Sequence, residues 1–358
     1  MTPRDSSCGC SAGSSTAAPR AGTGDTAPCT CTGRSPRGRA WAELLRLPAL
    51  FSVPGDALAG TAATGATPNA RTLLAIGSSL CLYEAGMALN DWADRDIDAV
   101  ERPHRPLPSG RIRPAAALTA ACALTGAGLA LASCAGRPAL AVAVPLAATV
   151  WAYDLGLKHT PAGPVAMAAA RGLDLLLGAA ATTGRTRPAL PSAALLGTHT
   201  LAVTTVSRQE AQGGTPLAPL AALATTALLT RVVTHRPSEH RGTTALAPLG
   251  PGATRPPGPV LGRKPAAHLS PARPRQESGM AVTTALAAAY VAATARPYFH
   301  ATLNPSPPLT QRAVGAGVRA TIPLQATLTA RSKGTATALL IAALAPLGAR
   351  LARKVSVT

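Results

Sequence analysis

Residues 90–113 read NDWADRDIDAVERPHRPLPSGRIR. Asp91 and Asp94 are three residues apart, and Asp94 and Asp98 are four apart. On a helix these spacings place the three carboxylates on one face, where they repel one another. Mg²⁺ relieves such repulsion, because it takes oxygen ligands and commonly joins carboxylates to substrate phosphates. The segment therefore predicts a magnesium–diphosphate site in which these three aspartates hold the metal and Asn90 adds a neutral oxygen.

The same run has a simpler interpretation, which is an acidic, solvated helix end. Two features count against it. The run continues directly from an apolar stretch, so its carboxylates lie where charge is costly and usually functional. It is also followed by Arg102 and Arg105 in a segment with prolines and a glycine, which predicts a rigid basic loop facing phosphate oxygens. We therefore expect both arginines to bind the substrate.

Outward from this segment, the chain is a series of apolar stretches rich in Ala, Leu, Gly and Val. Its 358 residues are 47% hydrophobic and only 14% charged, whereas an ordinary soluble domain is about 25% charged. Stretches long enough to cross about 30 Å of hydrocarbon recur. Their approximate bounds are 43–66, 72–92, 115–135, 138–157, 161–183, 189–207, 214–233, 279–300 and 334–352. The stretch at 43–66 is the weakest candidate for a membrane span, because it contains Pro54 and Asp56. The expected fold class is an all-α polytopic membrane protein with about nine transmembrane helices.

Three segments lie outside this pattern. Residues 1–40 are rich in Ser, Thr, Gly, Pro and Arg, and residues 231–278 form a Pro/Arg/Gly-rich insertion. Neither composition buries enough apolar surface to offset the entropy of ordering the chain, so both are expected to be disordered. The transmembrane domain is expected at 41–352, with a short C-terminal tail at 353–358.

The net charge of +19 is typical of proteins that meet nucleic acid, an anionic membrane surface or an anionic substrate. Nucleic acid is the partner we exclude, because apolar segments fill the centre of the chain and aromatic residues are only 3%. Arginines precede the first stretch, and five more lie within residues 93–114. This pattern predicts a multi-pass protein of the cell membrane with a cytoplasmic N-terminus. The Arg-rich segment 231–278 departs from the rule, since the same count places it outside.

A second polar cluster, Tyr153-Asp154-x-x-x-Lys158, ends the fourth apolar stretch. Tyr153 would hydrogen-bond a phosphate and Lys158 would place a positive charge on it, although both residue types also anchor helices at the membrane interface. Within the fifth stretch, Arg171 and Asp174 are three residues apart on one helix face. They either neutralise each other, or Arg171 reaches the diphosphate.

These motifs resemble those of the UbiA superfamily of intramembrane prenyltransferases. Its N-D-x-x-D-x-x-x-D signature and the R-P-x-R-P-L-P-S-G run that follows are matched within residues 90–110. Tyr153 and Lys158 match its Y-x-x-x-K element, with the spacing shifted by one residue. The resemblance covers about 41–352 without the insertion. It implies nine transmembrane helices around a central cavity in the lipid bilayer, with Mg²⁺ as cofactor and a prenyl diphosphate as substrate.

Within that superfamily the chain is most similar to the EboC subgroup. The similarity lies in Leu-Tyr-Glu-Ala-Gly-Met before the first motif and in Ser-Arg-Gln-Glu at 207–210. Typical members carry a second aspartate motif, D-x-x-x-D, at the latter place, and no aspartate stands there in this chain. The resemblance implies that magnesium at both motifs draws off the diphosphate. In this chain the stabilisation of the leaving group would then depend on Glu210, Arg208 and Lys158.

The function that follows is prenyl transfer to an unknown acceptor, by a transferase of alkyl groups other than methyl. The expected catalytic residues are Lys158, Tyr153 and Glu210. The expected substrate-binding residues are Asn90, Arg102, Arg105, Arg171 and Arg208. The alternative is a non-catalytic protein that binds a polyprenyl or lipid phosphate or assists metabolite export, and the missing second motif favours it. A small-molecule transporter is a third hypothesis, which no inverted repeat or pair of broken helices supports.

Overall fold

The computed structural model of the chain describes residues 36–210, 214–235, 274–332 and 334–355. Within these ranges all regular structure is helical, as the sequence predicted. The α-helices are α1 (Pro36–Leu44), α2 (Val53–Ala63), α3 (Ala70–Ala93), α4 (Arg95–Glu101), α5 (Pro114–Ala135), α6 (Arg137–Leu155), α7 (Gly163–Thr183), α8 (Leu190–Ser207), α9 (Leu217–Thr234), α10 (Pro274–Leu303), α11 (Pro307–Arg331) and α12 (Thr335–Val355). Three short 3₁₀-helices are η1 (Leu47–Ser52), η2 (Leu157–His159) and η3 (Arg187–Ala189).

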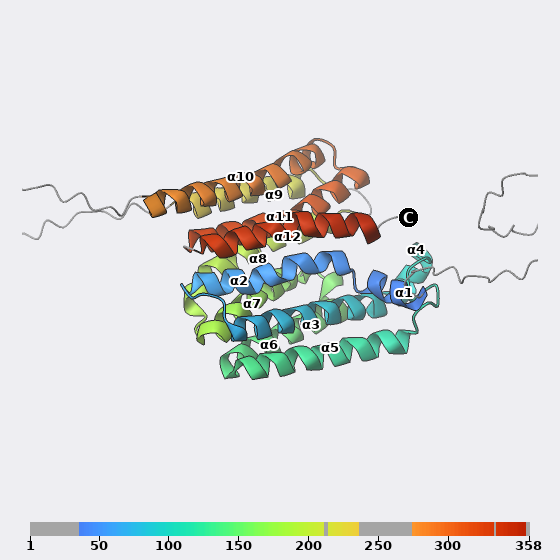
Figure 1. The fold of residues 1–358 in the computed structure, drawn as a ribbon. Helices are drawn as coiled ribbons and strands as arrows, with labels where there is room; N and C mark the ends of the chain where they lie inside the picture. The colour runs from blue at the N-terminus through green and yellow to red at the C-terminus, as the bar shows by residue number, and fades with distance from the viewer. Residues whose placement is uncertain (1–35, 211–213, 236–273, 333, 356–358) are drawn as a thin grey trace, which may run out of the picture. The chain divides into compact units, whose positions relative to one another are not determined.

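The long helices lie side by side in one bundle, and α1 and α4 both lie at one end of it (Figure 1). Among the described residues, six helical segments are long and apolar enough to cross a membrane, namely α3, α5, α6, α7, Arg187–Ser207 and α9. They coincide with the second to seventh of the predicted spans. The architecture is therefore that of a polytopic membrane protein, while the count of nine spans stays a prediction.

The stretch predicted at 43–66 is not one continuous helix. After α1 ends, Arg46 takes a left-handed backbone conformation with φ 48°, and η1 then leads into an α2 of only 11 residues. Pro48 and Pro54 account for these breaks, since a proline fixes φ and has no N–H to donate to the preceding turn. The break at Arg46 turns the chain at the end of the bundle where α4 lies.

Helix α11 was not predicted as a span. Its 25 residues include Arg312, Arg319 and Gln325, which lower its mean hydropathy. It nevertheless packs against α2, α8, α10 and α12, and Gln325 is fully buried. A helix that packs against other helices does not need an apolar surface all round, because a buried polar side chain such as Gln325 faces protein instead of lipid. Arg312 and Arg319, in contrast, are exposed.

The predicted tails and insertion fall largely outside the described residues, namely 1–35 and 236–273. The residues of these predicted segments that the structure does describe are largely helical. Helix α1 begins at Pro36, α9 continues to Thr234, α10 begins at Pro274 and α12 continues to Val355. The helical domain therefore extends a few residues into each of these segments.

Helices α2 and α7 approach each other backbone to backbone. A Cβ atom placed on Gly178 of α7 would contact the backbone of Ala57, and one on Gly60 of α2 would contact the backbone of Leu175. Small residues permit such approach in membranes, where dispersion contacts between helices replace the hydrophobic effect as the source of association. The contact places Asp56, the neighbour of Ala57, directly against α7.

Gly178→Ala should therefore loosen the bundle. The added methyl group requires α2 to move, at a cost of about 1–3 kcal/mol, and we expect a lower midpoint of thermal unfolding in detergent. Gly126→Ala in α5 is the matched control, because nothing lies within 4 Å of a Cβ at that position. It should leave the midpoint unchanged or raise it, since Ala favours helix by about 1 kcal/mol over Gly. Equal midpoints for the two variants would contradict the packing described.

Candidate functional site

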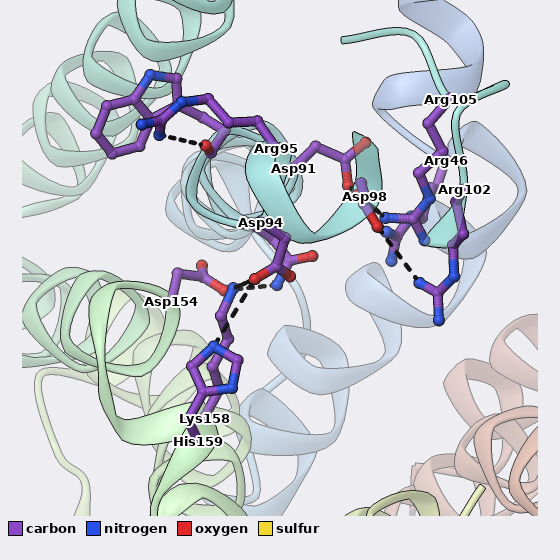
Figure 2. A network of polar contacts seen from close by, with 12 residues as sticks. Arg46, Asp91, Asp94, Arg95, Asp98, Arg102, Arg105, Asp154, Lys158 and His159 are labelled. Carbon is purple, nitrogen blue, oxygen red and sulfur yellow. Dashed lines mark hydrogen bonds and ion pairs between the residues drawn. The ribbon is translucent and has the colours of Figure 1, made fainter. Parts of the chain in front are cut away.

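The aspartate motif lies at a break between two helices. Asp94 is both the last cap of α3 and the first cap of α4, with φ −88° and ψ 3°. The prediction that the three carboxylates share one face of one helix is wrong, because the helix changes direction at Asp94. Figure 2 shows Asp91 and Asp98 pointing toward a group of arginines, while Asp94 points away from them toward Lys158.

Asp91 and Asp98 both contact Arg105. Its Nη1 lies 2.6 Å from Asp98 Oδ2 and 3.5 Å from Asp91 Oδ1. Arg46 adds a contact of 3.1 Å to Asp91, and Arg102 one of 3.8 Å to Asp98. The Asp98 side chain is only 3% exposed, so its charge is balanced by arginines and not by water. We call these five residues the arginine group.

The loop that carries Arg105 is held by apolar contacts. Leu107 and Ile112 are buried in a cluster with Leu44 of α1 and Leu89 of α3. Because the loop is fixed on both sides of the arginine, the guanidinium is presented to the aspartates with little freedom to move away.

A bidentate ion pair also joins this loop to α1. Arg111 donates to the two Glu43 carboxylate oxygens at 2.7 and 3.1 Å. The hydrogen bond to Glu43 holds the pKa of Arg111 above its usual value. The loop is thereby tied to the segment that carries Arg46.

Asp94, Lys158 and His159 form a second group, which we call the lysine group. Lys158 Nζ lies 2.7 Å from Asp94 Oδ1, and His159 Nε2 lies 3.8 Å from the same atom. Beside them, the Asn90 amide donates to Asp154 Oδ1 at 3.1 Å. Both Lys158 and His159 come from η2, the turn after α6. The turn that carries Lys158 therefore lies against the aspartate motif (Figure 2), while the predicted contacts of Tyr153 and Lys158 with a phosphate stay a prediction.

The remaining predicted residues lie further from the aspartates. Tyr153 lines a cavity beside Asn90 and Asp154. Arg208 is exposed and donates to the carbonyl of Thr160. Glu210 is half-buried, and within the described part of the chain no ion pair joins it to either group. Arg171 pairs with Asp56 at 3.0 Å and lies apart from the aspartate motif.

A cavity of about 250 Å³ opens between α3, α6 and α7. One end is polar and is lined by Arg46, Asn90, Tyr153 and Asp154; we call it the mouth. The walls are mostly apolar and are lined by Leu82, Gly86, Met87, Leu146, Val150, Met167 and Ala170. The other end is polar again and is lined by Ser79, Tyr83, Arg171 and Asp174; we call it the floor.

The donor atoms at the mouth suit Mg²⁺, but their present arrangement does not preform a site for the bare ion. Carboxylate and amide oxygens are its usual ligands. Among the described residues, however, no three His, Cys, Asp or Glu side chains are grouped so as to hold a metal. Mg²⁺ is commonly held by one or two carboxylates together with substrate phosphates, and the lysine group meets that requirement with Asp94 beside Asp154.

Sequence reasoning gave no role to several residues that contact the predicted ones or lie beside them. Arg46 follows an apolar run at the break before η1, and an arginine in a predicted span was the signal that could have found it. Asp154 was quoted with Tyr153 but given no role. Gln325 lay in the helix that was not predicted, so no local signal connected it with Asp56, whose Oδ1 it contacts at 2.6 Å.

Comparison with known proteins places these features in a family context. The sequence profile described as the UbiA prenyltransferase family matches residues 50–235, more than half of the chain. Digeranylgeranylglyceryl phosphate synthase from Methanothrix thermoacetophila is 39% identical over 112 residues, which are 31% of this chain and 42% of that protein. The enzyme of the same name from Methanopyrus kandleri is 34% identical over 128 residues, or 34% of this chain and 45% of that protein. The chain thus matches less than half the length of these relatives.

Solved structures extend the likeness of fold. A UbiA homolog from Archaeoglobus fulgidus, bound to GPP and Mg²⁺, superposes with a TM-score of 0.51 at 16% identity. The superposition covers 83% of this chain and 99% of the homolog. At that identity it supports the helical architecture alone.

The arginine group should be needed for folding as well as for any ligand. Asp98→Asn removes a buried charge that two arginines share, and we expect it to cost about 2 kcal/mol, seen as a lower midpoint of thermal unfolding without Mg²⁺. Asp96→Asn is the matched control, because the Asp96 side chain is 83% exposed and pairs with its neighbour Arg95. A midpoint for Asp98→Asn equal to that of the control would show that the arginines do not depend on this carboxylate.

Proposed function

Because the chain belongs to the UbiA prenyltransferase family, we propose that it is a membrane prenyltransferase that takes a prenyl diphosphate with Mg²⁺ and transfers the prenyl group to an acceptor. The observation that carries the proposal is the pairing of the motif aspartates with Lys158 and arginines beside the polar end of an otherwise apolar cavity, the end that Arg46 and Asp154 line. Such a cavity matches the two parts of a prenyl diphosphate, an anionic head and a hydrocarbon tail.

Basic side chains would balance the charge of the diphosphate. The motif aspartates are neutralised in this structure by Lys158 and by the three arginines of the arginine group, Arg46, Arg102 and Arg105. Arginine presents paired N–H donors that fit phosphate oxygens, and lysine acts as a point charge. These groups can therefore exchange a carboxylate partner for a phosphate partner without moving far. Tyr153 and Asn90, at the mouth, would hydrogen-bond the same head group.

Asp91, Asp94 and Asp98 are the residues that would hold Mg²⁺, with Asp94 closest to the lysine group. When bound, the metal would stabilise negative charge that develops on the leaving diphosphate. During transfer, the bond between the first prenyl carbon and the diphosphate oxygen breaks, and its electron pair leaves with the diphosphate. The acceptor supplies the electron pair of the new bond and loses a proton to the released diphosphate or to water.

The apolar walls of the cavity would protect the reaction from water. An electron-deficient prenyl carbon reacts with any nucleophile that reaches it, so exclusion of water favours the acceptor. The second aspartate motif is replaced by Ser-Arg-Gln-Glu, and we propose that Arg208 and Glu210 take part from that side. Arg208 is exposed and held at the Thr160 carbonyl, two residues after Lys158, which supports a role in charge balance beside the lysine group.

Two finer points belong to the same proposal. The LYEAGM and SRQE segments support a place in the EboC subgroup. The arginines of residues 93–114 support a cytoplasmic position for the end of the bundle that carries α1 and α4.

Asp94→Ala and Lys158→Met should each lower diphosphate release. The assay uses purified protein, Mg²⁺, labelled geranyl diphosphate and a membrane extract as the source of acceptor. We expect a loss of about 100-fold or more, because each removes a charge aimed at the reacting group. Asp96→Ala, which removes an exposed carboxylate of the same segment, should retain full activity.

Three outcomes distinguish the possibilities. Release that depends on Asp94 supports the enzyme. Tight Mg²⁺-dependent binding without release, across donors of every length, would instead support a carrier of prenyl or lipid phosphates. If Asp91→Ala and Asp94→Ala both leave binding unchanged, the diphosphate does not bind at the mouth.

A further inference from the structure

The floor of the cavity contains more hydrogen-bond donors than its own contacts use. Arg171 contacts Asp56 Oδ2 at 3.0 Å through Nη1, and its side chain is 17% exposed. Among the described residues, no hydrogen bond or ion pair joins its Nε or Nη2 to another group. The Tyr83 hydroxyl, which also borders the cavity, has no hydrogen-bond partner in the described part of the chain either. The floor therefore presents unused N–H and O–H groups to whatever occupies the cavity.

Carboxylate oxygens lie beside these donors. Asp174, three residues after Arg171 on α7, borders the cavity and accepts a hydrogen bond from Ser79. Behind Arg171, Gln325 donates to Asp56 Oδ1 at 2.6 Å. The floor thus combines one guanidinium with two carboxylates and has no surplus positive charge. Buried ion pairs are often replaceable by apolar groups without loss of stability, whereas charged residues inside a membrane bundle usually mark a functional position.

The floor lies close to the place where a prenyl diphosphate would react. On α3, Tyr83 is four residues before Met87 and seven before Asn90, which is about 6 and 10 Å along the helix axis. With the diphosphate at the level of Asn90, the first prenyl carbon would lie near the level of Met87. A glycerol unit, whose bonds are about 1.5 Å long, spans about the distance from that level to Tyr83. A small head group held at the floor therefore reaches the reacting carbon.

We propose that the floor binds the head group of the prenyl acceptor, and that this head group is uncharged and bears hydroxyl groups. This inference rests on the proposed function and identifies the class of its second substrate. A hydroxyl both donates and accepts, so it suits Asp174 and Arg171 together. An ammonium group only donates and leaves the N–H groups of Arg171 unused. A phosphate or carboxylate would face the two carboxylates of the floor, and such like-charge contacts are strongly unfavourable.

A second hydroxyl of the same head group would then reach the first prenyl carbon. Its oxygen forms the bond to that carbon while the bond from the carbon to the diphosphate oxygen breaks. The electron pair of the broken bond leaves with the diphosphate. The hydroxyl proton passes to the released diphosphate, and the product is an ether. The hydrocarbon part of the acceptor needs no polar contact and extends along the apolar walls or into lipid.

The first test compares four amphiphiles with the same eight-carbon chain, namely 1-O-octylglycerol, octyl phosphate, octylamine and octanoate esterified to nothing, as its free anion. Each is titrated calorimetrically into the protein in phosphatidylcholine nanodiscs, with empty nanodiscs as the reference. 1-O-octylglycerol should bind at least tenfold more tightly than each of the other three. Equal affinities, or tighter binding of a charged probe, would overturn the proposal.

Two variants locate the binding. Tyr83→Phe removes one hydroxyl and keeps the ring, and Asp174→Asn removes a charge but keeps an oxygen that accepts from Ser79. Each should lower the affinity for 1-O-octylglycerol about fivefold or more, and Asp174→Asn should raise that for octanoate and octyl phosphate. Tyr298→Phe is the matched control, because Tyr298 does not line this cavity and its buried hydroxyl has no hydrogen-bond partner among the described residues. If both floor variants behave like the control, the head group does not bind at the floor.

Binding of the donor separates the acceptor site from the proposed function. Labelled geranyl diphosphate with Mg²⁺ should bind Tyr83→Phe and Asp174→Asn within about twofold of its affinity for the unchanged protein, whereas Asp94→Ala should lose it. Normal donor binding without discrimination among the four amphiphiles would overturn the acceptor site and leave the proposed function intact. If no donor binds to the unchanged protein, the proposed function fails, and the acceptor site fails with it.

Discussion

Charge neutralisation within the protein is the constraint on which this structure depends. Hydrocarbon offers no water to a carboxylate, so a buried aspartate needs an ionic or hydrogen-bonding partner from the chain itself. Asp98 and Asp91 find theirs in Arg105, and Asp94 finds its own in Lys158. The break between α3 and α4 makes this division possible, because an unbroken helix would turn all three carboxylates toward one side.

The same constraint acts at the far end of the cavity. There the close approach of α2 and α7 brings Asp56 to Arg171, and α11 contributes Gln325 from behind. The result is a cavity that is polar at both ends and apolar between them. Its chemistry follows from that order, since a charged head group and a hydrocarbon tail separate naturally along it.

The sequence predicted the parts of this arrangement that depend on local pattern. Hydropathy identified the spans that became α3 and α5 to α9, and spacing identified the aspartate motif with its arginine-rich loop. The likeness of motifs to a known family singled out Lys158, and the structure adds its contact with Asp94. Pairwise contacts between distant segments were beyond local pattern. Nothing near Asp56 in the sequence indicates Gln325, and nothing near Asp91 indicates Arg46.

Two errors have a common physical origin. Helix α11 was missed because its two exposed arginines and its buried Gln325 lower its mean hydropathy, although its C-terminal half is buried among other helices. The single face expected for the aspartates was wrong because helical spacing holds only while the helix continues, and Asp94 ends it. Both errors arose where tertiary contacts override a local periodicity.

The pairing of Asp56 with Arg171 has a consequence for how such a chain can evolve. Loss of either partner alone strands a charge in the bundle, which typically costs 3–5 kcal/mol, while loss of both is close to neutral. A single substitution at either position is therefore expected to be selected against. Homologous sequences should keep both residues or have exchanged both, so that the two columns covary although 115 positions separate them in the chain.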